Sequence, residues 1–398
     1  MKTRVHVAGT GVISAIGLSR NESLDSFRRQ RTGIGHIDLL ETKHKGVMQV
    51  GEIKLTNAQL SDKLEIKKYY TRATLLGIHA AREAVAHSGI DISRYRTGLI
   101  SGTTVGGMDR MEEFLIDFFP DNSHGKLKDV INHECGKSTE CIAKEIGLKG
   151  FISTVNTACS SSVNSIMTGV RMIQHGMMDV VIAGGTDCLT RFTMNGFNSL
   201  MILDGSACRP FDASRNGLNL GEGAGYVVLV SDKVLEQERL KLAAHVSGFA
   251  NTNDAYHQTA SSPEGRGSYD AMVQALELAG LNAADIDYIN LHGTGTLNND
   301  LSEGTAVKRL FGEQYPSMSS TKAFTGHTLG ASGGIEAVFS IMAIEEGCLF
   351  PNLRFENAIP ETAIIPQREF ATGVEVKNVM SNSFGFGGNC SSIIFSRN

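Results

Sequence analysis

The sequence predicts an α/β fold made of two similar halves, and two observations support this prediction. Short β-branched runs bounded by glycine, such as VHVAGTGVI (5–13), alternate with segments whose apolar residues recur at helical spacing, such as residues 71–89. Alternation of this kind is typical of α/β proteins. In addition, the order of strand, turn and helix signals in the first part of the chain recurs in the second part.

The first part contains further predicted strands at residues 97–104, 179–187 and 224–231, all short and bounded by glycine. The predicted helix of residues 71–89 ends at Gly89, a residue type that commonly terminates helices. The second part repeats these signals. Four pairs of segments correspond: 5–11 with 245–251, 99–107 with 289–296, 153–173 with 318–344, and 226–231 with 391–396. We therefore expect two halves, residues 1–240 and 241–398, with the charged segment 232–241 as their connector.

Composition excludes several classes of protein. The net charge of −5 argues against general nucleic-acid binding, which needs a basic surface. No apolar run approaches the ~18 residues that a membrane-spanning helix requires. The seven cysteines are odd in number and scattered, which is typical of a reducing compartment and predicts neither a zinc site nor a disulfide framework. We expect a cytoplasmic protein without a metal site and without a role at membranes.

Cys159, in NTACSSSVNSI, is the first candidate for chemistry. A predicted strand ends at Ala158 and a helix of small residues follows, so that Cys159 lies at a helix N-terminus. There the helix dipole and the free N–H groups favour the thiolate over a thiol whose usual pKa is about 8.5. The N–H of Cys159 itself could also stabilise an oxyanion on a bound acyl group.

Two histidines and a lysine occupy corresponding turns of the second half. His292 follows a predicted strand in LHGTGT (291–296), and His327 lies in TKAFTGHTLGASGG (321–334), at the position that Cys159 holds in the first half. If the halves pack with pseudo-symmetry, the ends of these strands converge and the three side chains share one cleft. Lys322, five residues before His327, adds a positive charge to the same turn.

The segment NSFGFGGNCSS (382–392) is a glycine-rich loop with two aromatic residues. It runs straight into a terminal strand, so it lacks the strand–loop–helix context of a nucleotide site. We expect a mobile loop beside the cleft, with Phe384 or Phe386 as a bulky gate.

The residues resemble the β-ketoacyl-acyl carrier protein synthases of the thiolase superfamily, most closely the elongating type II enzymes and related polyketide ketosynthases. The resemblance covers essentially the whole chain. It rests on six motifs in the family's order: NTACSSS (156–162), CRPFDASRNGLNLGEGAG (208–225), NDAYHQTASSPEGRG (253–267), LHGTGTLNNDLSEG (291–304), STKAFTGHTLGASGGIE (320–336) and NSFGFGGN (382–389). It implies thiolase-like duplicated βαβαβαββ halves that form a layered α-β-α-β-α body.

The resemblance also implies catalytic roles. Cys159 would carry the acyl chain as a thioester, while His292 and His327 would bind the malonyl carbonyl and stabilise the charge that develops as carbon dioxide leaves. Lys322 would order His327. The N–H groups of Cys159 and Phe384 would form the oxyanion hole, and the Phe384 ring would gate the acyl pocket.

Other residues would bind substrate or support the site. Thr294 and Thr296 would hydrogen-bond the pantetheine arm, and Glu336 would be a structural partner near the lysine. Phe197 and Phe386 would contact the substrate, with Phe197 and residues 103–108 as candidates for the pocket floor.

The implied reaction is a decarboxylative Claisen condensation in fatty acid or polyketide synthesis. The substrates would be carried on the phosphopantetheine of acyl carrier protein, and the enzyme would need no cofactor of its own. We expect the carrier protein to dock on a cationic helix face formed by Lys63, Lys67, Lys68 and Arg72. By resemblance alone, the chain would form a homodimer or a heterodimer with a related subunit.

Four alternatives differ in their active residues. A non-catalytic chain-length subunit would lack the cysteine, a thiolase would use a second cysteine and one histidine, an initiating synthase would use Cys-His-Asn, and a cysteine hydrolase would need one histidine. Cys159 with two histidines disfavours all four. Asn216 and Leu297 stand where the family has Asp and often Pro, which leaves the subfamily and the acyl substrate open.

Overall fold

The computed structural model describes residues 3–398, and within them the main strands form one ten-stranded sheet with the order β10-β9-β13-β14-β8-β1-β7-β6-β4-β5. The strands of the first half are β1 (Val5–Ser14), β4 (Thr97–Gly102), β5 (Phe151–Val155), β6 (Val180–Asp187) and β7 (Gly223–Ser231). Those of the second half are β8 (Ala244–Asn253), β9 (Tyr288–Asn290), β10 (Ser317–Ser319), β13 (Asn378–Gly385) and β14 (Asn389–Arg397).

The two halves of the sheet share one topology. In the first half β4 runs parallel to β5 and β6, and β7 pairs antiparallel with both β6 and β1. In the second half β9 runs parallel to β10 and β13, and β14 pairs antiparallel with both β13 and β8. The halves meet where β1 and β8 pair over Val5–Val7. The predicted duplication of an α/β unit is therefore confirmed.

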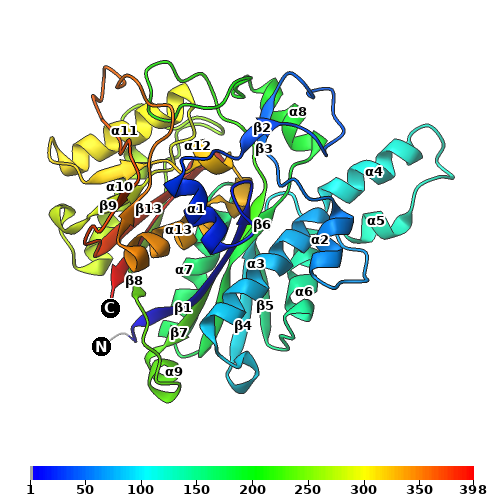
Figure 1. Cartoon of the computed structure of the whole chain (residues 1–398), viewed down its shortest axis with the longest axis horizontal. Helices are drawn as coiled ribbons and strands as arrows, with labels where there is room; N and C mark the ends of the chain where they lie inside the picture. The colour runs from blue at the N-terminus through cyan, green and yellow to red at the C-terminus, as the bar shows by residue number, and fades with distance from the viewer. Residues whose placement is uncertain (1–2) are drawn as a thin grey trace.

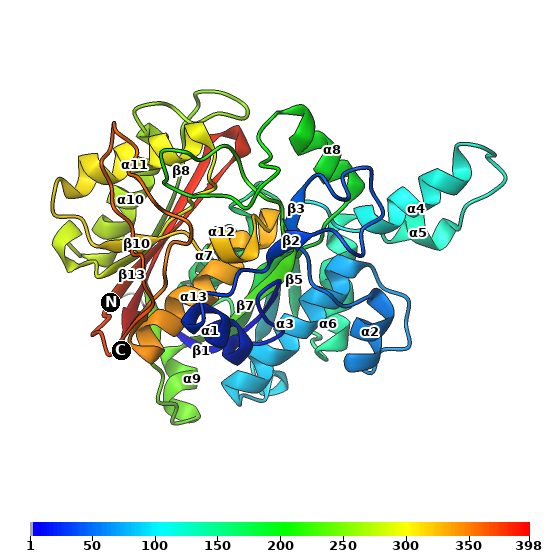
Figure 2. The same ribbon diagram turned by 45° about the horizontal axis from the view of Figure 1, so that its top comes forward.

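Helices lie between and outside the two halves of the sheet, as Figure 1 and Figure 2 show. The central helices α7 (Ser161–Gln174) and α13 (Ser332–Glu346) pack against each other and against strands of the sheet. Helix α3 (Arg72–Ser88) covers the outer face of the first half, and α10 (Arg266–Ala279) with α11 (Leu297–Phe311) covers the second. The predicted layered body is confirmed.

The sequence of α13 explains its central place. Its side chains from Ser332 to Ile344 are all buried, as expected for a helix that is apolar on every side. Gly225 of β7 allows the close approach, since a Cβ there would lie 2.4 Å from the backbone of Gly334. This contact draws the start of α13 toward the centre of the sheet.

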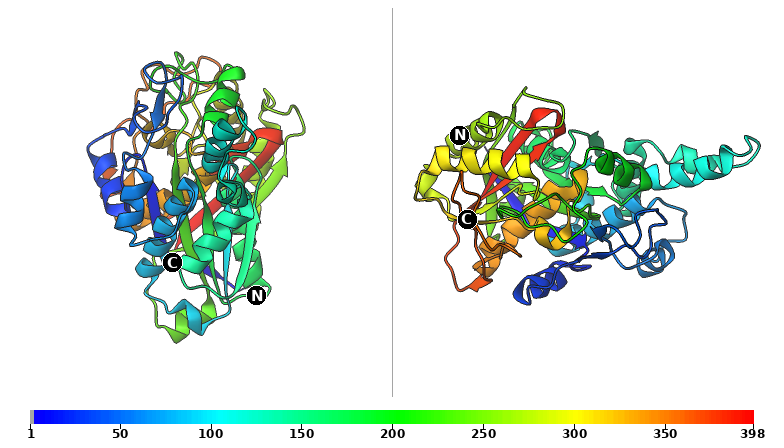
Figure 3. Two further views of the ribbon diagram at one scale, coloured as in Figure 1. Left: turned by 90° about the vertical axis from the view of Figure 1, so that its right-hand side faces the viewer. Right: turned by 90° about the horizontal axis from the view of Figure 1, so that it is seen from above.

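The other elements are short or peripheral. Helices α4 (Met108–Phe118) and α5 (Leu127–Ile131) form an arm that projects from the body, as Figure 1 and Figure 3 show. None of the helices in residues 3–398 is long and apolar enough to cross a membrane. The remaining elements are α1 (Arg20–Arg28), β2 (Ile34–His36), β3 (Gln49–Gly51), α2 (Asn57–Lys63), α6 (Cys135–Glu145), α8 (Arg191–Ser199), α9 (Asp232–Gln237), α12 (Lys322–Thr325), β11 (Cys348–Leu349) and β12 (Ala371–Thr372).

Candidate active site

A cavity of about 290 Å³ opens where the two halves meet, and Cys159, His292 and His327 all line it. The sulfur of the cysteine and one ring nitrogen of each histidine lie within 4.8 Å of one another. The sequence prediction that these three side chains share a cleft agrees with this geometry.

Cys159 lies in a tight turn between β5 and α7. The preceding residue, Ala158, has a left-handed φ of 52°, and its carbonyl accepts a hydrogen bond from the Ser161 N–H at 3.1 Å. Ser160 is the N-cap residue of α7, so Cys159 immediately precedes the helix. The turn presents the sulfur to the cavity while the side chain stays 94% buried, with 6% exposed.

The expected thiolate form of Cys159 is not favoured by its surroundings. Burial raises the pKa of the Cys159 thiol to about 11, although the Lys322 charge and the backbone N–H groups of Phe386 and Cys159 act in the opposite direction. This direction is opposite to the predicted lowering of the thiol pKa, because desolvation in the cavity outweighs the Lys322 charge and the two backbone N–H groups. The nucleophile rests as a thiol and must lose its proton during the reaction.

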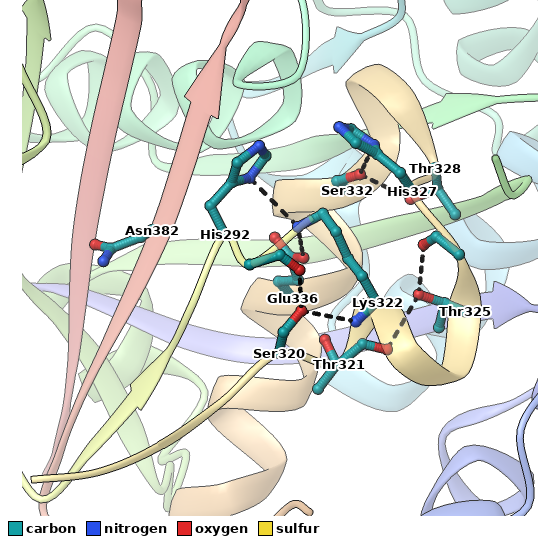
Figure 4. A network of polar contacts seen from close by, with 12 residues as sticks. His292, Ser320, Thr321, Lys322, Thr325, His327, Thr328, Ser332, Glu336 and Asn382 are labelled. Carbon is teal, nitrogen blue, oxygen red and sulfur yellow. Dashed lines mark hydrogen bonds and ion pairs between the residues drawn. The ribbon is translucent and has the colours of Figure 1, made fainter. Parts of the chain in front are cut away.

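Both histidine rings have their Nδ1 atoms occupied. The Lys322 ammonium, which can only donate, lies 3.3 Å from His292 Nδ1 (Figure 4). His327 Nδ1 accepts from the Leu329 backbone N–H at 3.0 Å, and Ser332 Oγ lies 3.1 Å away. A neutral imidazole whose Nδ1 accepts carries its proton on Nε2. The two rings therefore present Nε2–H donors to the cavity.

Burial and the neighbouring Lys322 charge lower the pKa of both His292 and His327 well below the usual value. Both rings are consequently neutral near pH 7. This state matters for metal binding as well, because a protonated Nε2 cannot be a metal ligand. The three residues could hold an ion only after both rings changed tautomer.

Lys322 and Glu336 form a buried ion pair behind the histidines, and their side chains are 2% and 3% exposed (Figure 4). Burial raises the pKa of the Glu336 carboxyl to about 7, and the lysine opposes this shift. The lysine orders His292 directly, whereas the sequence suggested that it orders His327.

The structure corrects the expectation for Phe384. This residue belongs to β13, where it pairs with Cys390 of β14, and its ring is buried 5.9 Å from the ring of His292. The backbone N–H group that acts to lower the pKa of the Cys159 thiol from this segment belongs to Phe386 and not to Phe384. The flexible glycines, Gly387 with φ 80° and Gly388 with φ 76°, also follow Phe386. The position of Phe386 therefore fits the roles of oxyanion donor and gate that were predicted for Phe384 better than the position of Phe384 does.

Two family models match the chain: "Beta-ketoacyl synthase, N-terminal domain" over residues 2–234 and "Beta-ketoacyl synthase, C-terminal domain" over residues 243–356. The chain belongs to the β-ketoacyl synthase family. A 3-oxoacyl-[acyl-carrier-protein] synthase 2 of Staphylococcus aureus (strain COL) is 34% identical over 410 residues, which cover 99% of this chain and 98% of the relative.

Solved structures of ketosynthases have the same fold over the whole chain. The ishigamide ketosynthase/chain length factor matches with a TM-score of 0.94 and 28% identity, covering 100% of both chains. A ketosynthase in complex with its chain length factor from Xenorhabdus doucetiae matches with a TM-score of 0.87 and 30% identity, covering 100% of this chain and 98% of the other.

Other predicted residues of this β-ketoacyl synthase lie around the same cavity. Thr294, Thr296 and Phe197 line it, and the ring of Phe386 stacks on that of Phe197 with centroids 5.7 Å apart. Residues 103–108, the other candidates for a pocket floor, do not line this cavity.

The four residues of the predicted cationic helix face do not lie on one helix. Helix α2 ends at Lys63 and α3 begins at Arg72, so the basic residues lie on different elements. Arg72 is buried in an ion pair with Glu222 at 2.6 Å, and Lys68 pairs with Glu145 at 2.6 Å. Lys63 and Lys67 are exposed, and so is Lys68, whose side chain is 53% exposed.

Two acidic residues that support the site were not predicted. Glu303 accepts hydrogen bonds from the backbone N–H groups of His292 at 2.9 Å and Gly293 at 2.8 Å, which fixes the end of the strand that carries the histidine. Asp187, at the end of β6, accepts from both halves of the molecule. Glu303 lies within the motif at 291–304, but only its packing reveals its part.

Proposed function

We propose that this enzyme joins an acyl group on Cys159 to a malonyl unit on acyl carrier protein by decarboxylative Claisen condensation. One observation carries the proposal: a cysteine sulfur faces two neutral imidazoles whose Nδ1 atoms are both occupied. Such rings are donors rather than bases, as the second half-reaction requires. A hydrolase needs a histidine that accepts the proton of the cysteine.

In the first half-reaction the Cys159 sulfur attacks the thioester carbonyl of the incoming acyl carrier. The carbonyl oxygen becomes an oxyanion, which the N–H groups of Cys159 and Phe386 stabilise. The bond between the carbonyl carbon and the pantetheine sulfur then breaks, and the proton of the cysteine thiol passes to the departing pantetheine sulfur. Loss of one oxyanion donor typically costs about 2.7–4 kcal/mol of barrier.

In the second half-reaction the malonyl thioester carbonyl accepts hydrogen bonds from Nε2–H of His292 and His327. The bond to the carboxylate breaks, carbon dioxide leaves, and the electron pair moves onto the thioester oxygen as an enolate. The enolate carbon attacks the acyl carbonyl on Cys159, the bond between that carbon and the cysteine sulfur breaks, and the released thiolate takes up one proton from solvent to restore the resting thiol. These proposed steps need no resident metal or cofactor.

The two half-reactions can be measured apart. His292→Ala and His327→Ala should release at least about 100-fold less carbon dioxide from malonyl-acyl carrier protein, since each removes a donor to the developing charge. Mass spectrometry should still detect the acyl group on Cys159 in both variants. Cys159→Ala should lose the acyl adduct. If both histidine variants lost acyl loading as completely as condensation, a hydrolase-like Cys–His pair would replace this proposal.

We also propose a carrier-docking surface and a cytoplasmic location. The side chains of Lys63 and Lys67 are exposed, and an acidic carrier would be attracted to them in a salt-dependent way. Lys63→Glu with Lys67→Glu should raise KM for carrier-bound malonyl at low salt and leave KM for malonyl-pantetheine unchanged. Equal KM values for the carrier-bound substrate in the variant and the parent protein would remove this surface from consideration.

A further inference from the structure

One buried carboxylate links the two halves of the molecule beside the catalytic histidines. Asp187 is the last residue of β6, and its side chain is fully buried. Within residues 3–398 no basic side chain forms an ion pair with Asp187, so its carboxylate is stabilised by hydrogen-bond donors alone. The segments that supply these donors are the parts of the molecule that Asp187 holds in place.

The donors from the first half come from the turn that follows β4. Asp187 accepts from the Thr103 hydroxyl at 2.6 Å and from the Thr104 hydroxyl at 2.7 Å. It also accepts from the backbone N–H groups of Thr104 at 3.0 Å and Val105 at 3.1 Å. These four bonds fix the carboxylate on the first half.

The donor from the second half is the backbone N–H of Gly330, at 2.7 Å from Oδ2, the oxygen that also accepts from the Thr104 hydroxyl. A side chain at position 330 would displace this contact, because a Cβ on Gly330 would lie 2.9 Å from Asp187 Oδ2 and 3.0 Å from the Thr104 methyl carbon. The carboxylate therefore anchors the 3₁₀ turn Leu329–Ala331 to β6.

That turn sets the chemistry of His327. Leu329 has a left-handed φ of 53°, an unfavourable conformation for a branched side chain, and its N–H donates to His327 Nδ1 at 3.0 Å. The neighbouring N–H, that of Gly330, is the group held by Asp187. The consecutive backbone amides of Leu329 and Gly330 thus connect the Asp187 carboxylate to the His327 imidazole.

We propose that Asp187 is a positioning residue that holds the Leu329–Ala331 turn in its strained form, so that His327 keeps its proton on Nε2 and aims it at the malonyl carbonyl. The expected effect on kinetics rests on the proposed function, whereas the expected effect on the His327 tautomer does not. An asparagine cannot replace the carboxylate, because its NH₂ group would face N–H and O–H donors. Loss of the carboxylate that fixes a catalytic histidine tautomer lowers kcat by about 10⁴ in serine proteases.

The test compares Asp187→Asn with Thr104→Val, which removes one hydroxyl donor but leaves the Gly330 contact intact. In the full chain, Asp187→Asn should slow malonyl decarboxylation at least about tenfold while acylation of Cys159 changes less than about threefold. Thr104→Val should keep both rates. The ¹⁵N spectrum of histidine-labelled protein should show the Nε2–H tautomer of His327 in the parent and a mixture of tautomers in Asp187→Asn.

A second variant approaches the same contact from the other side. Gly330→Ala would push the carboxylate away and should give the same selective loss and the same change in tautomer, even if Asp187→Asn fails to fold. An unchanged His327 spectrum in a folded Asp187→Asn or Gly330→Ala protein would overturn the inference. An equal loss of Cys159 acylation and malonyl decarboxylation in these variants would also overturn the inference. If the parent protein itself condensed nothing, the proposed function would fail, while the spectrum would still decide the part played by Asp187.

Discussion

At the scale of single residues, the site depends on where each proton rests. Lys322 and the Leu329 backbone occupy the Nδ1 atoms of the two histidines, which leaves both rings as donors. Cys159 keeps its own proton, because the burial that excludes water from the cavity also disfavours the thiolate. The nucleophile is therefore activated by the bound substrate and the oxyanion donors, not by a preformed ion pair.

The raised pKa of Cys159 predicts slow alkylation at neutral pH. A thiol with a pKa of about 11 is ionised to roughly one part in 10³ at pH 8, and its thiolate fraction grows tenfold for each pH unit up to that value. The rate of Cys159 modification by iodoacetamide, followed by mass spectrometry, should therefore keep rising between pH 7 and pH 10. A plateau above pH 8.5 would show that the helix terminus outweighs burial.

The Lys322–Glu336 pair predicts a large effect on stability. Glu336→Gln leaves a buried ammonium without its counter-charge, which typically costs about 3–5 kcal/mol of the free energy of unfolding. Denaturant unfolding would measure this cost. The matched control is Glu313→Gln, whose ion pair with Lys308 lies on the surface with the glutamate 90% exposed, and which should change the free energy by less than about 1 kcal/mol. Equal effects of the two variants would contradict the expectation.

At the scale of elements, the sequence predicts the position of a side chain well where a strand runs into a turn. It predicts the position poorly where the strand ends in a glycine-rich segment. Cys159, His292 and His327 were predicted from such strand ends, and the structure brings them together. In NSFGFGG both aromatic residues have glycine neighbours, so the pattern does not locate the end of β13 and leaves Phe384 and Phe386 open, while the roles of Phe384 rest on the resemblance alone. Arg72 was misplaced for a similar reason, since spacing alone does not reveal that a helix stops at Lys63.

The end of β13 predicts different outcomes for the two aromatic residues. Phe386 stacks on Phe197 beside two glycines of positive φ, so Phe386→Ala should keep the fold and Cys159 acylation. Without the ring in the cavity, malonyl decarboxylation should no longer require a prior acyl chain. Phe384→Ala should instead lower the free energy of unfolding by about 3–5 kcal/mol, because the ring is buried. Carbon dioxide release with and without acyl donor, together with thermal unfolding, separates the two roles. Acyl-dependent decarboxylation that persists in Phe386→Ala would exclude a gate at this position.

At the scale of the whole molecule, the duplication could be predicted from the sequence, because each half keeps the same order of strands, turns and helices. The division at residues 240 and 241 stays a prediction, since the β1–β8 pairing makes one continuous sheet. Long-range polar contacts such as Asp187 with Gly330 could not be predicted, because they join residues 143 positions apart through packing alone.

Another feature of the whole molecule is the open edge of the sheet. Strand β5 ends the sheet, and its Phe151 and Ile152 are 41% and 39% exposed.

This edge and the projecting arm predict contact with a second subunit. Unpaired N–H and C=O groups on an edge strand readily pair with another chain, and the arm adds exposed apolar residues, with Phe119 of the α4–α5 segment 78% exposed. We expect the protein to sediment as a dimer at micromolar concentration, or as a heterodimer with a related subunit when the two are expressed together. Ile152→Lys with Phe119→Asp should shift it to monomer, whereas Leu278→Asp, on the outer helix α10, should leave the dimer intact. A sedimentation coefficient that is the same for the double variant and the parent would place the subunit contact elsewhere on the molecule.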